Sequence, residues 1–261
     1  MIALLASLAF AGDPANSPLF SGTNTPWTIG EKNGAFGLFR PVTIGIDDRT
    51  EISANGLAFF LAPTVEFKRE LWDHDSGFSL AAGGELGVPT FAFKMLQTGF
   101  LQPIGADQTV AWTLVPGASV YGGWRNDQVA VSMRIHFRGG IPLTSRGDKP
   151  LEFQDVPWLD PLLAPLVTGW SLAPTIRLDW TPNAGWVITG QGRIEFSGGP
   201  DLGGKIFVLR AIGNHVAVGL GVAMAWEKFR YGFHDWDDRT PAPPPVVPLD
   251  MMPLLDVQGR W

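Results

Sequence analysis

The chain has 261 residues, a formal net charge of −6, no cysteine and only 17% charged residues, together with 32 glycines and 11 tryptophans. The absence of cysteine excludes a disulfide scaffold and cysteine-based metal sites, and the mildly acidic balance gives no electrostatic basis for binding nucleic acid. Soluble proteins normally carry about 25% charged residues, so this chain would present unusually few charges to water.

The N-terminal region contains two distinct segments. Residues 2–10 are apolar and lead into the small-residue sequence AFA at 9–11, a pattern typical of a secretory signal peptide over residues 1–11. The apolar run has no Lys or Arg before it, and a buried N-terminal segment is the alternative interpretation. Residues 12–32 are rich in Pro, Ser, Asn and Thr, which predicts a loosely held N-terminal arm.

Apolar and polar residues alternate with a period of two through most of the remaining chain. In residues 128–137, large apolar side chains occupy every odd position, and small, polar or charged ones occupy every even position. This alternation indicates a β-strand with two different faces. Gly56 or Pro63 could divide the long second strand. The predicted strands are 33–46, 49–71, 78–88, 109–124, 128–138, 170–180, 186–197, 205–212, 215–230 and 254–261.

The length of these strands favours a membrane-spanning barrel. About twelve residues at about 3.3 Å each, tilted by about 40°, rise about 30 Å, which exceeds an apolar band of about 25 Å. Strands of soluble sandwiches are typically only about 5–6 residues long, and no apolar run approaches the roughly 18–20 residues of a spanning helix. We therefore predict an all-β, antiparallel, up-and-down transmembrane β-barrel of about ten strands, with 12 or 8 as alternatives, in one domain over residues 33–261.

The connections and the tryptophans support this prediction. If both termini are periplasmic, the short connections fall on the periplasmic side and most connections on the other side are long, as in transmembrane barrels. The indole ring has an apolar body and a polar N–H and suits a membrane interface, although packing in a β-sandwich core is the alternative. Predicted periplasmic strand ends carry Trp72, Trp124, Trp180, Trp186 and Trp261, and the opposite ends carry Trp112, Trp170 and Trp226.

The charged residues indicate which face points inward. An arginine facing lipid at the bilayer midplane costs about 2–4 kcal/mol, and the strand arginines Arg134, Arg177 and Arg193 all lie on the small, polar face. Both signs of charge share that face, so we expect internal ion pairs and a lumen that can be closed rather than open. The predicted lumen-lining charged residues are Glu66, Lys68, Glu85, Arg134, His136, Arg177, Asp179, Arg193 and Glu195.

The C-terminus carries the most specific pattern. Trp261 ends the chain, with Gly259, Val257 and Leu255 in phase before it, although Pro253 cuts the pattern short. This arrangement resembles the assembly signal of bacterial outer-membrane β-barrel proteins. The resemblance is one of architecture; it implies a Gram-negative outer membrane, periplasmic termini, insertion by the barrel-assembly machinery, and contact with outer-membrane lipids. It implies no cofactor.

The favoured function is non-enzymatic: a structural barrel, or a narrow, porin-like passive channel for small solutes. One alternative is an outer-membrane hydrolase, because residues 234–238 (HDWDD), with Asp107 as a further carboxylate, faintly resemble the acidic residues and the His-Asp pair of the omptin-like proteases, in a different spacing. Another is a secreted soluble β-barrel that binds an apolar ligand. Asp73, His74 and Asp75 are metal-ligating residue types in a predicted turn, and no metal site or catalytic residue is predicted.

Overall fold

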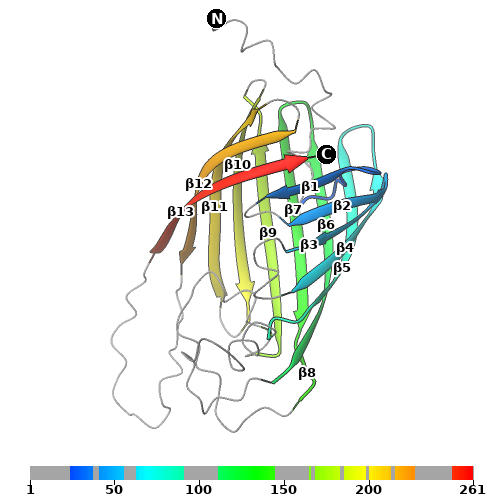
Figure 1. Cartoon of the computed structure of the whole chain (residues 1–261), viewed down its shortest axis with the longest axis vertical. Helices are drawn as coiled ribbons and strands as arrows, with labels where there is room; N and C mark the ends of the chain where they lie inside the picture. The colour runs from blue at the N-terminus through cyan, green and yellow to red at the C-terminus, as the bar shows by residue number, and fades with distance from the viewer. Residues whose placement is uncertain are drawn as a thin grey trace, which may run out of the picture.

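The computed structural model describes residues 24–37, 41–55, 63–90, 111–144, 165, 168–182, 185–197, 200–212, 215–226 and 249–260. These residues form thirteen β-strands (Figure 1). The strands are β1 (Gly34–Gly37), β2 (Val42–Asp47), β3 (Thr50–Ala54), β4 (Thr64–Asp73), β5 (Phe78–Gly87), β6 (Thr113–Arg125), β7 (Val129–Gly139), β8 (Ile141–Pro142), β9 (Trp170–Trp180), β10 (Trp186–Phe196), β11 (Pro200–Ile212), β12 (Val216–Trp226) and β13 (Leu249–Arg260). Among the described residues, no helix is long and apolar enough to cross a membrane.

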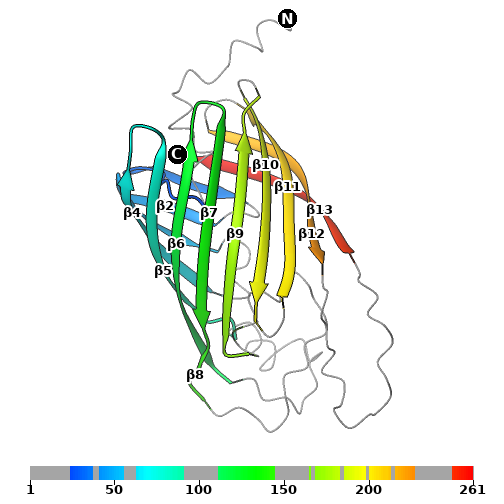
Figure 2. The same ribbon diagram turned by 180° about the vertical axis from the view of Figure 1, so that it is seen from behind.

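Twelve of these strands close into an antiparallel barrel. The hydrogen-bonded order runs β5-β4-β3-β2-β1-β13-β12-β11-β10-β9-β7-β6, and β6 pairs back with β5 to complete the circle. The two-residue strand β8 pairs only with the start of β6 and lies outside this circle. Figure 2 shows the long strands β6, β7, β9 and β10 side by side along the height of the molecule. The predicted all-β antiparallel barrel is confirmed.

The main prediction of ten strands is wrong and the alternative of 12 is the number in the closed barrel, because two of the predicted strands are hairpins. The segment 33–46 forms β1 and β2, and the segment 49–71 forms β3 and β4. Pro41 immediately precedes β2, and Pro63 immediately precedes β4. Proline has no amide hydrogen to donate to a strand ladder and is confined to strand starts and edges. The outward-facing positions stay even-numbered from Phe36 to Val42, so the alternation did not mark the first break. They change from even at Ile52 to odd at Val65, and Pro63 is one of the two positions expected to divide the second strand.

The connections fall into two groups because neighbouring strands are antiparallel. At one end, where β1 begins and β13 ends, the connections are 48–49, 74–77, 126–128, 181–185 and 213–215 (Figure 1). At the opposite end the connections are 38–41, 55–63, 88–112, 140–169, 197–199 and 227–248. The first group contains only short connections, and we call that end the short-turn end. Since β11 begins at Pro200, the connection from β10 is shorter than the sequence suggests.

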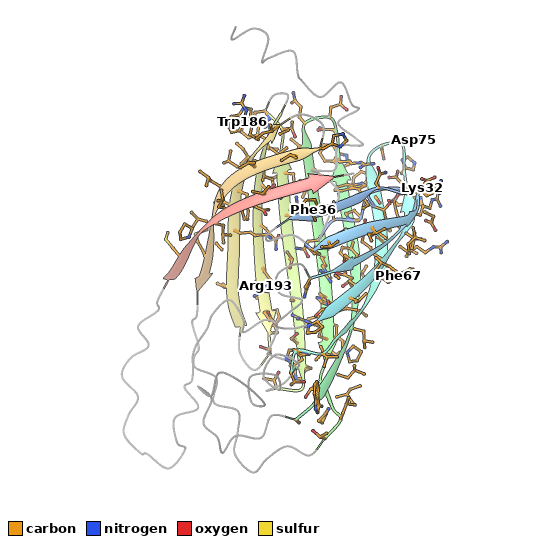
Figure 3. All side chains as sticks on the ribbon, in the orientation of Figure 1. Lys32, Phe36, Phe67, Asp75, Trp186 and Arg193 are labelled. Atoms are coloured by element: carbon orange, nitrogen blue, oxygen red, sulfur yellow. The ribbon has the colours of Figure 1, made fainter. Side chains whose placement is uncertain are left out.

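Large apolar side chains are exposed on the outer face around the whole circumference of the barrel, and Arg69 on β4 and Arg210 on β11 are also exposed there. Each of the twelve barrel strands exposes at least one large apolar side chain, and Leu220 at the middle of β12 is 68% exposed. Phe36 and Phe67 belong to this outer face, whereas Arg193 lies on the inner face (Figure 3). The inside and the outside of the barrel therefore have the reverse of the polarity found in a water-soluble protein.

One part of the inner wall is apolar. A cluster on β10–β13 consists of Val187, Phe207, Leu209, Ala217, Ala223 and Leu254, all buried. Glycines on β12 make room for the two largest members of the cluster. A Cβ atom on Gly221 would lie 2.6 Å from Phe207 Cδ1, and one on Gly219 would lie 2.5 Å from Leu209 Cδ2. A side chain cannot be added at either position unless the wall moves.

Replacement of these glycines tests the packing of the inner wall. We expect Gly221→Ala to lower the free energy of unfolding by about 1–3 kcal/mol, because the added methyl group overpacks against Phe207 and the backbone of β11. Gly203→Ala is the matched control on β11, since its nearest contact would be 3.8 Å away, and we expect a change within about 0.5 kcal/mol. Urea unfolding in detergent micelles, followed by tryptophan fluorescence, measures both. Equal effects of the two substitutions would contradict this packing.

Candidate functional site

The polar interior of the barrel is the candidate functional site. Ion pairs join strands that are not neighbours, namely β7 to β4 in Arg134–Glu66 and β7 to β10 in Arg138–Glu195. Contacts between non-adjacent strands cross the inside of the barrel. Side chains on this face that are buried and charged or polar include Glu51, Lys68, Glu70, Ser119, Ser132, Arg134, His136, Arg138, Ser171, Thr175, Asp179, Thr189, Glu195 and Asp256.

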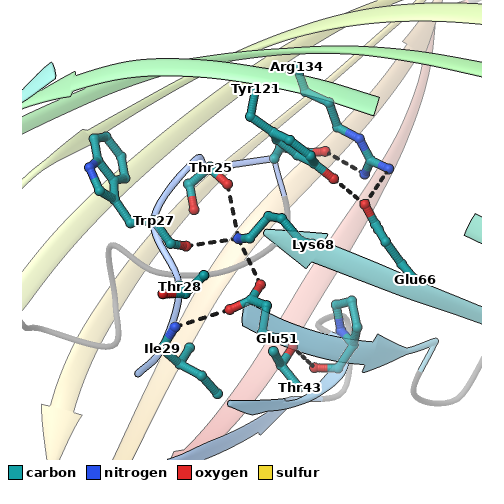
Figure 4. Close-up of polar contacts among 12 residues, drawn as sticks. Thr25, Trp27, Thr28, Ile29, Thr43, Glu51, Glu66, Lys68, Tyr121 and Arg134 are labelled. Carbon is teal, nitrogen blue, oxygen red and sulfur yellow. Dashed lines mark hydrogen bonds and ion pairs between the residues drawn. The ribbon is translucent and has the colours of Figure 1, made fainter. Parts of the chain in front are cut away.

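Arg134 is the centre of the largest polar cluster (Figure 4). Its Nη2 donates to Glu66 Oε1 at 2.8 Å and to Ser119 Oγ at 2.8 Å, and its Nε also donates to Ser119 Oγ, at 3.1 Å. The guanidinium carbon lies 5.1 Å from the centre of the Tyr121 ring, and the Tyr121 hydroxyl donates to Glu66. Arg134 faces Tyr121 directly in the β6–β7 register, so strand pairing brings these side chains together. The buried charge is thereby compensated, as a low-dielectric interior requires.

A chain of further contacts continues along β7. His136 Nε2 lies 3.3 Å from Glu85 Oε2 on β5, and Arg138 Nη2 lies 3.6 Å from Glu195 Oε1 on β10. Glu195 is shared, because its other oxygen lies 3.3 Å from Arg193 Nη2. Alternation along β7 places Arg134, His136 and Arg138 on the same face and so produces this row.

A second compact group lies on β9 and β10. Arg177 donates three hydrogen bonds of 2.8–3.0 Å to the carboxylate of Asp179. Thr189 Oγ1 donates to the same carboxylate at 2.6 Å. Asp179 is 1% exposed, so its charge is neutralised entirely within the protein. Charge-assisted bonds of this kind are about twice as strong as neutral ones.

Residues 24–30 enter the interior from the short-turn end, and we call them the N-terminal plug. Lys68 Nζ donates to the backbone carbonyls of Thr25 at 3.0 Å and Trp27 at 2.8 Å, and lies 2.7 Å from Glu51 Oε1 (Figure 4). The other oxygen of Glu51 accepts from the backbone N–H of Ile29 at 3.0 Å. These contacts use all three ammonium hydrogens of Lys68. One buried ion pair thus fixes three residues of the plug.

Two further contacts hold the plug. Arg134 Nη1 donates to Asn24 Oδ1 at 3.1 Å, which joins the plug to the Arg134 cluster. Trp27 is 1% exposed and packs against Ala130, and Arg125 lies over its ring at 5.0 Å. The absence of a side chain at Gly123 gives the indole its space, because a Cβ atom there would lie 3.0 Å from Trp27 Cη2.

The expectation of a loosely held arm over residues 12–32 is therefore wrong for its described part. The amino-acid composition of this segment reflects only its local Pro, Asn and Thr content. It could not predict the contacts of the plug, because the residues that the plug contacts lie far away in the sequence. Trp27 within this polar stretch was the available signal. Residues 1–23 lie outside the described residues, as do the predicted signal peptide and the remainder of the arm.

All nine predicted lumen-lining charged residues have their side chains on the inner face. The structure brings Glu66, Glu85, Arg134 and His136 into one cluster, pairs Arg177 with Asp179 and Arg193 with Glu195, and assigns Lys68 to the plug. The prediction omitted Glu51, Glu70, Tyr121, Arg138 and Lys205. Glu70 and Arg138 continue the phase of Glu66 and Arg134, so alternation could have found them. Glu51 lies on β3, where the inward-facing positions are odd-numbered rather than even-numbered as on β4.

The remaining positions singled out in the sequence are the C-terminal pattern, the 73–75 turn and residues 234–238 with Asp107. Leu255 and Val257 of the C-terminal pattern are exposed on the outer face, Gly259 packs against Phe36, and Trp261 lies outside the described residues. His74 Nδ1 contacts Ser76 Oγ at 2.8 Å in the β4–β5 turn. No group of His, Asp or Glu side chains suited to a metal occurs in the described part. Residues 234–238 and Asp107 lie outside the described residues.

The tryptophans of the predicted girdles lie at strand ends. Trp72, Trp124, Trp180 and Trp186 are at the short-turn end. Trp112 and Trp170 are at the opposite end, and the backbone of Trp226 ends β12 there.

No protein-family model matches this chain, and no curated protein matches it.

Loss of the Lys68 ammonium tests how the plug is held. We expect Lys68→Met to lower the free energy of unfolding by about 3–5 kcal/mol, because the buried Glu51 carboxylate loses its cation. The double variant Lys68→Met/Glu51→Gln should recover part of this loss, since it leaves no unpaired charge. Lys32→Met is the matched control, because Lys32 and Glu31 form an exposed pair at 3.1 Å worth about 0–1 kcal/mol. Urea titration compares the three variants, and an equal effect of Lys68→Met and Lys32→Met would refute this role.

Proposed function

We propose that the chain is an integral β-barrel protein of the bacterial outer membrane. The apolar outer face carries this proposal. Soluble monomers rarely expose contiguous apolar patches larger than a few hundred Å², whereas here exposed apolar side chains occur on every barrel strand. Many charged side chains of the described strands lie inside the barrel, and several of them form ion pairs there. A lipid bilayer is the solvent that matches an apolar exterior, and a closed barrel is one of the two folds that satisfy backbone hydrogen bonds within lipid.

The proposed orientation places both termini in the periplasm. Transmembrane barrels have short periplasmic turns and longer extracellular loops, with aromatic girdles at both interfaces. The first described strand begins and the last one ends at the short-turn end. Trp72 and Trp180 are exposed at that end, and Trp170 is exposed at the other end. These positions support contact with lipid headgroups on both sides.

Within this proposal, the barrel is a narrow passive channel for small solutes that the N-terminal plug holds closed. The support is the chemistry of the plug contacts, which are hydrogen bonds and ion pairs to Lys68, Glu51 and Arg134. Such bonds exchange readily with water when the plug moves, so the closed state can be left without loss of the barrel. Because the N-terminal plug closes the barrel, a polar interior is compatible with a membrane that does not leak.

The two other functions find less support. A soluble barrel for an apolar ligand needs an accessible apolar interior, but the apolar cluster on β10–β13 is at most 8% exposed. The hydrolase hypothesis rests on residues outside the described part, and no described feature adds to it. We therefore propose no catalytic role.

An arginine on the outer face tests insertion into a membrane. We expect Leu220→Arg to lower the folding free energy in lipid vesicles by about 2–4 kcal/mol, because Leu220 lies at the middle of β12 and would be near the bilayer midplane. Ile212→Arg is the matched control, since Ile212 is equally outward at the short-turn end, where the cost should be about 0–1 kcal/mol. Urea-dependent refolding into phosphatidylcholine vesicles measures both. Two equally mild effects would favour a soluble barrel instead.

Conductance across a planar bilayer tests the channel and its closure. We expect the full chain to insert with little current, and Lys68→Met to show discrete current steps with an open probability at least about tenfold higher. The reason is that every 1.4 kcal/mol lost from the plug changes the closed-to-open ratio about tenfold. Lys32→Met serves as the control. Inserted protein that stays closed in every variant would mean a structural barrel, and equal current in all variants would exclude closure by the plug.

A further inference from the structure

Lys205 differs from the other inward-facing cations. It lies on β11 in phase with the buried Phe207 and Leu209, while Ile206 and Val208 point outward. Its Nζ lies 5.8 Å from the centre of the Phe207 ring. In the part of the chain that the structure describes, Lys205 has no carboxylate within ion-pair distance and donates no hydrogen bond.

The acidic groups of this region already have partners. Asp179 accepts from Arg177 and Thr189. Glu195 is shared by Arg138 and Arg193. Asp256 on β13 accepts from Gln258 Nε2 at 2.8 Å. Asp179 and Asp256 act on Lys205 electrostatically from a longer distance, but no described carboxylate forms a direct ion pair with it.

Two other polar groups lie beside Lys205. Gln191 is its direct partner in the β10–β11 register, and Gln191 Oε1 is buried with no hydrogen-bond partner among the described residues. Arg193 extends over Gly203, two residues from Lys205 on the same face; a Cβ atom at Gly203 would lie 3.9 Å from Arg193 Nη2.

We propose that Lys205, Arg193 and Gln191 form a binding site for a small oxyanion, a carboxylate or a phosphate, on the inner wall of the barrel. An ammonium inside the barrel without a direct partner is costly, and the neighbouring charges of Arg193 and Lys205 repel each other. An oxyanion between them removes both costs, because the guanidinium fork matches carboxylate and phosphate geometry and the ammonium adds a compact charge. The Gln191 amide supplies an N–H donor to the same anion after rotation about its terminal bond. The buried apolar cluster beyond Phe207 limits the ligand to a small one.

If the bound anion is the transported solute, this inference extends the channel proposal and rests on it. As a binding site it is independent of conduction. The test therefore uses the full chain refolded in detergent micelles, where no current is required. The melting temperature is measured against inorganic phosphate, and separately against acetate, at constant ionic strength in chloride.

For the unmodified chain we expect a saturable rise in melting temperature with phosphate, with acetate, or with both; the responding ion identifies the ligand class. Lys205→Met should abolish the rise, and Lys32→Met should retain it because Lys32 is exposed and paired with Glu31. Arg193→Gln is the second variant in case Lys205→Met fails to fold. It should weaken the apparent anion affinity at least about tenfold, since one charge-assisted contact is lost.

A response that is absent in the unmodified chain, or identical in Lys205→Met, would overturn the proposed site. The bilayer measurement separates this failure from failure of the channel. Anion stabilisation without current would retain the site and reject conduction. Current without anion stabilisation would retain the channel and reject the site.

Discussion

Charge compensation across the barrel interior is the constraint on which the rest of this structure depends. A barrel with an apolar outer face has to place its charged side chains inside, and charges removed from bulk water are tolerated only when paired and hydrogen-bonded. The Arg134–Glu66 pair meets this requirement by joining β7 to β4, with two strands between them. The Arg138–Glu195 contact joins β7 to β10 in the same way. Such contacts tie together strands that do not pair directly with each other.

The same compensation couples closure of the barrel to its stability. Lys68 and Glu51 neutralise each other and at the same time satisfy backbone groups of the plug at Thr25, Trp27 and Ile29. Release of the plug would therefore expose a buried ion pair as well as the Trp27 indole. A plug held only by apolar packing would lack this link. In the proposed channel, the energy of the Lys68–Glu51 pair sets the balance between the closed and the open barrel.

Compensation is less complete on the other side of the interior. The wall from β3 to β7 carries paired charges around Arg134, whereas the wall from β10 to β13 carries the apolar cluster and, beside it, Lys205. This asymmetry gives the interior a satisfied half that holds the plug and a half with an available cation. In physical terms, the first half maintains the structure, and the second half is where an anionic solute would gain the most.

The sequence by itself determined the strands and their faces, because the alternation of polarity is a local property with a period of two. It placed Arg134 and His136, and likewise Arg177 and Asp179, on the inner face. It left the number of strands open between ten, 12 and 8. Pro63 marked a break within 49–71, whereas the alternation runs unbroken through 33–46, where only the pairing of β1 with β2 shows a hairpin. The sequence did not predict the plug either. Lys68 binds backbone carbonyl groups, and because every residue has one, no sequence pattern marks these contacts. Tertiary structure decided the partners of the charges that pair between strands, such as Arg134 with Glu66 and Arg138 with Glu195, because their proximity depends on how the strands are arranged around the barrel.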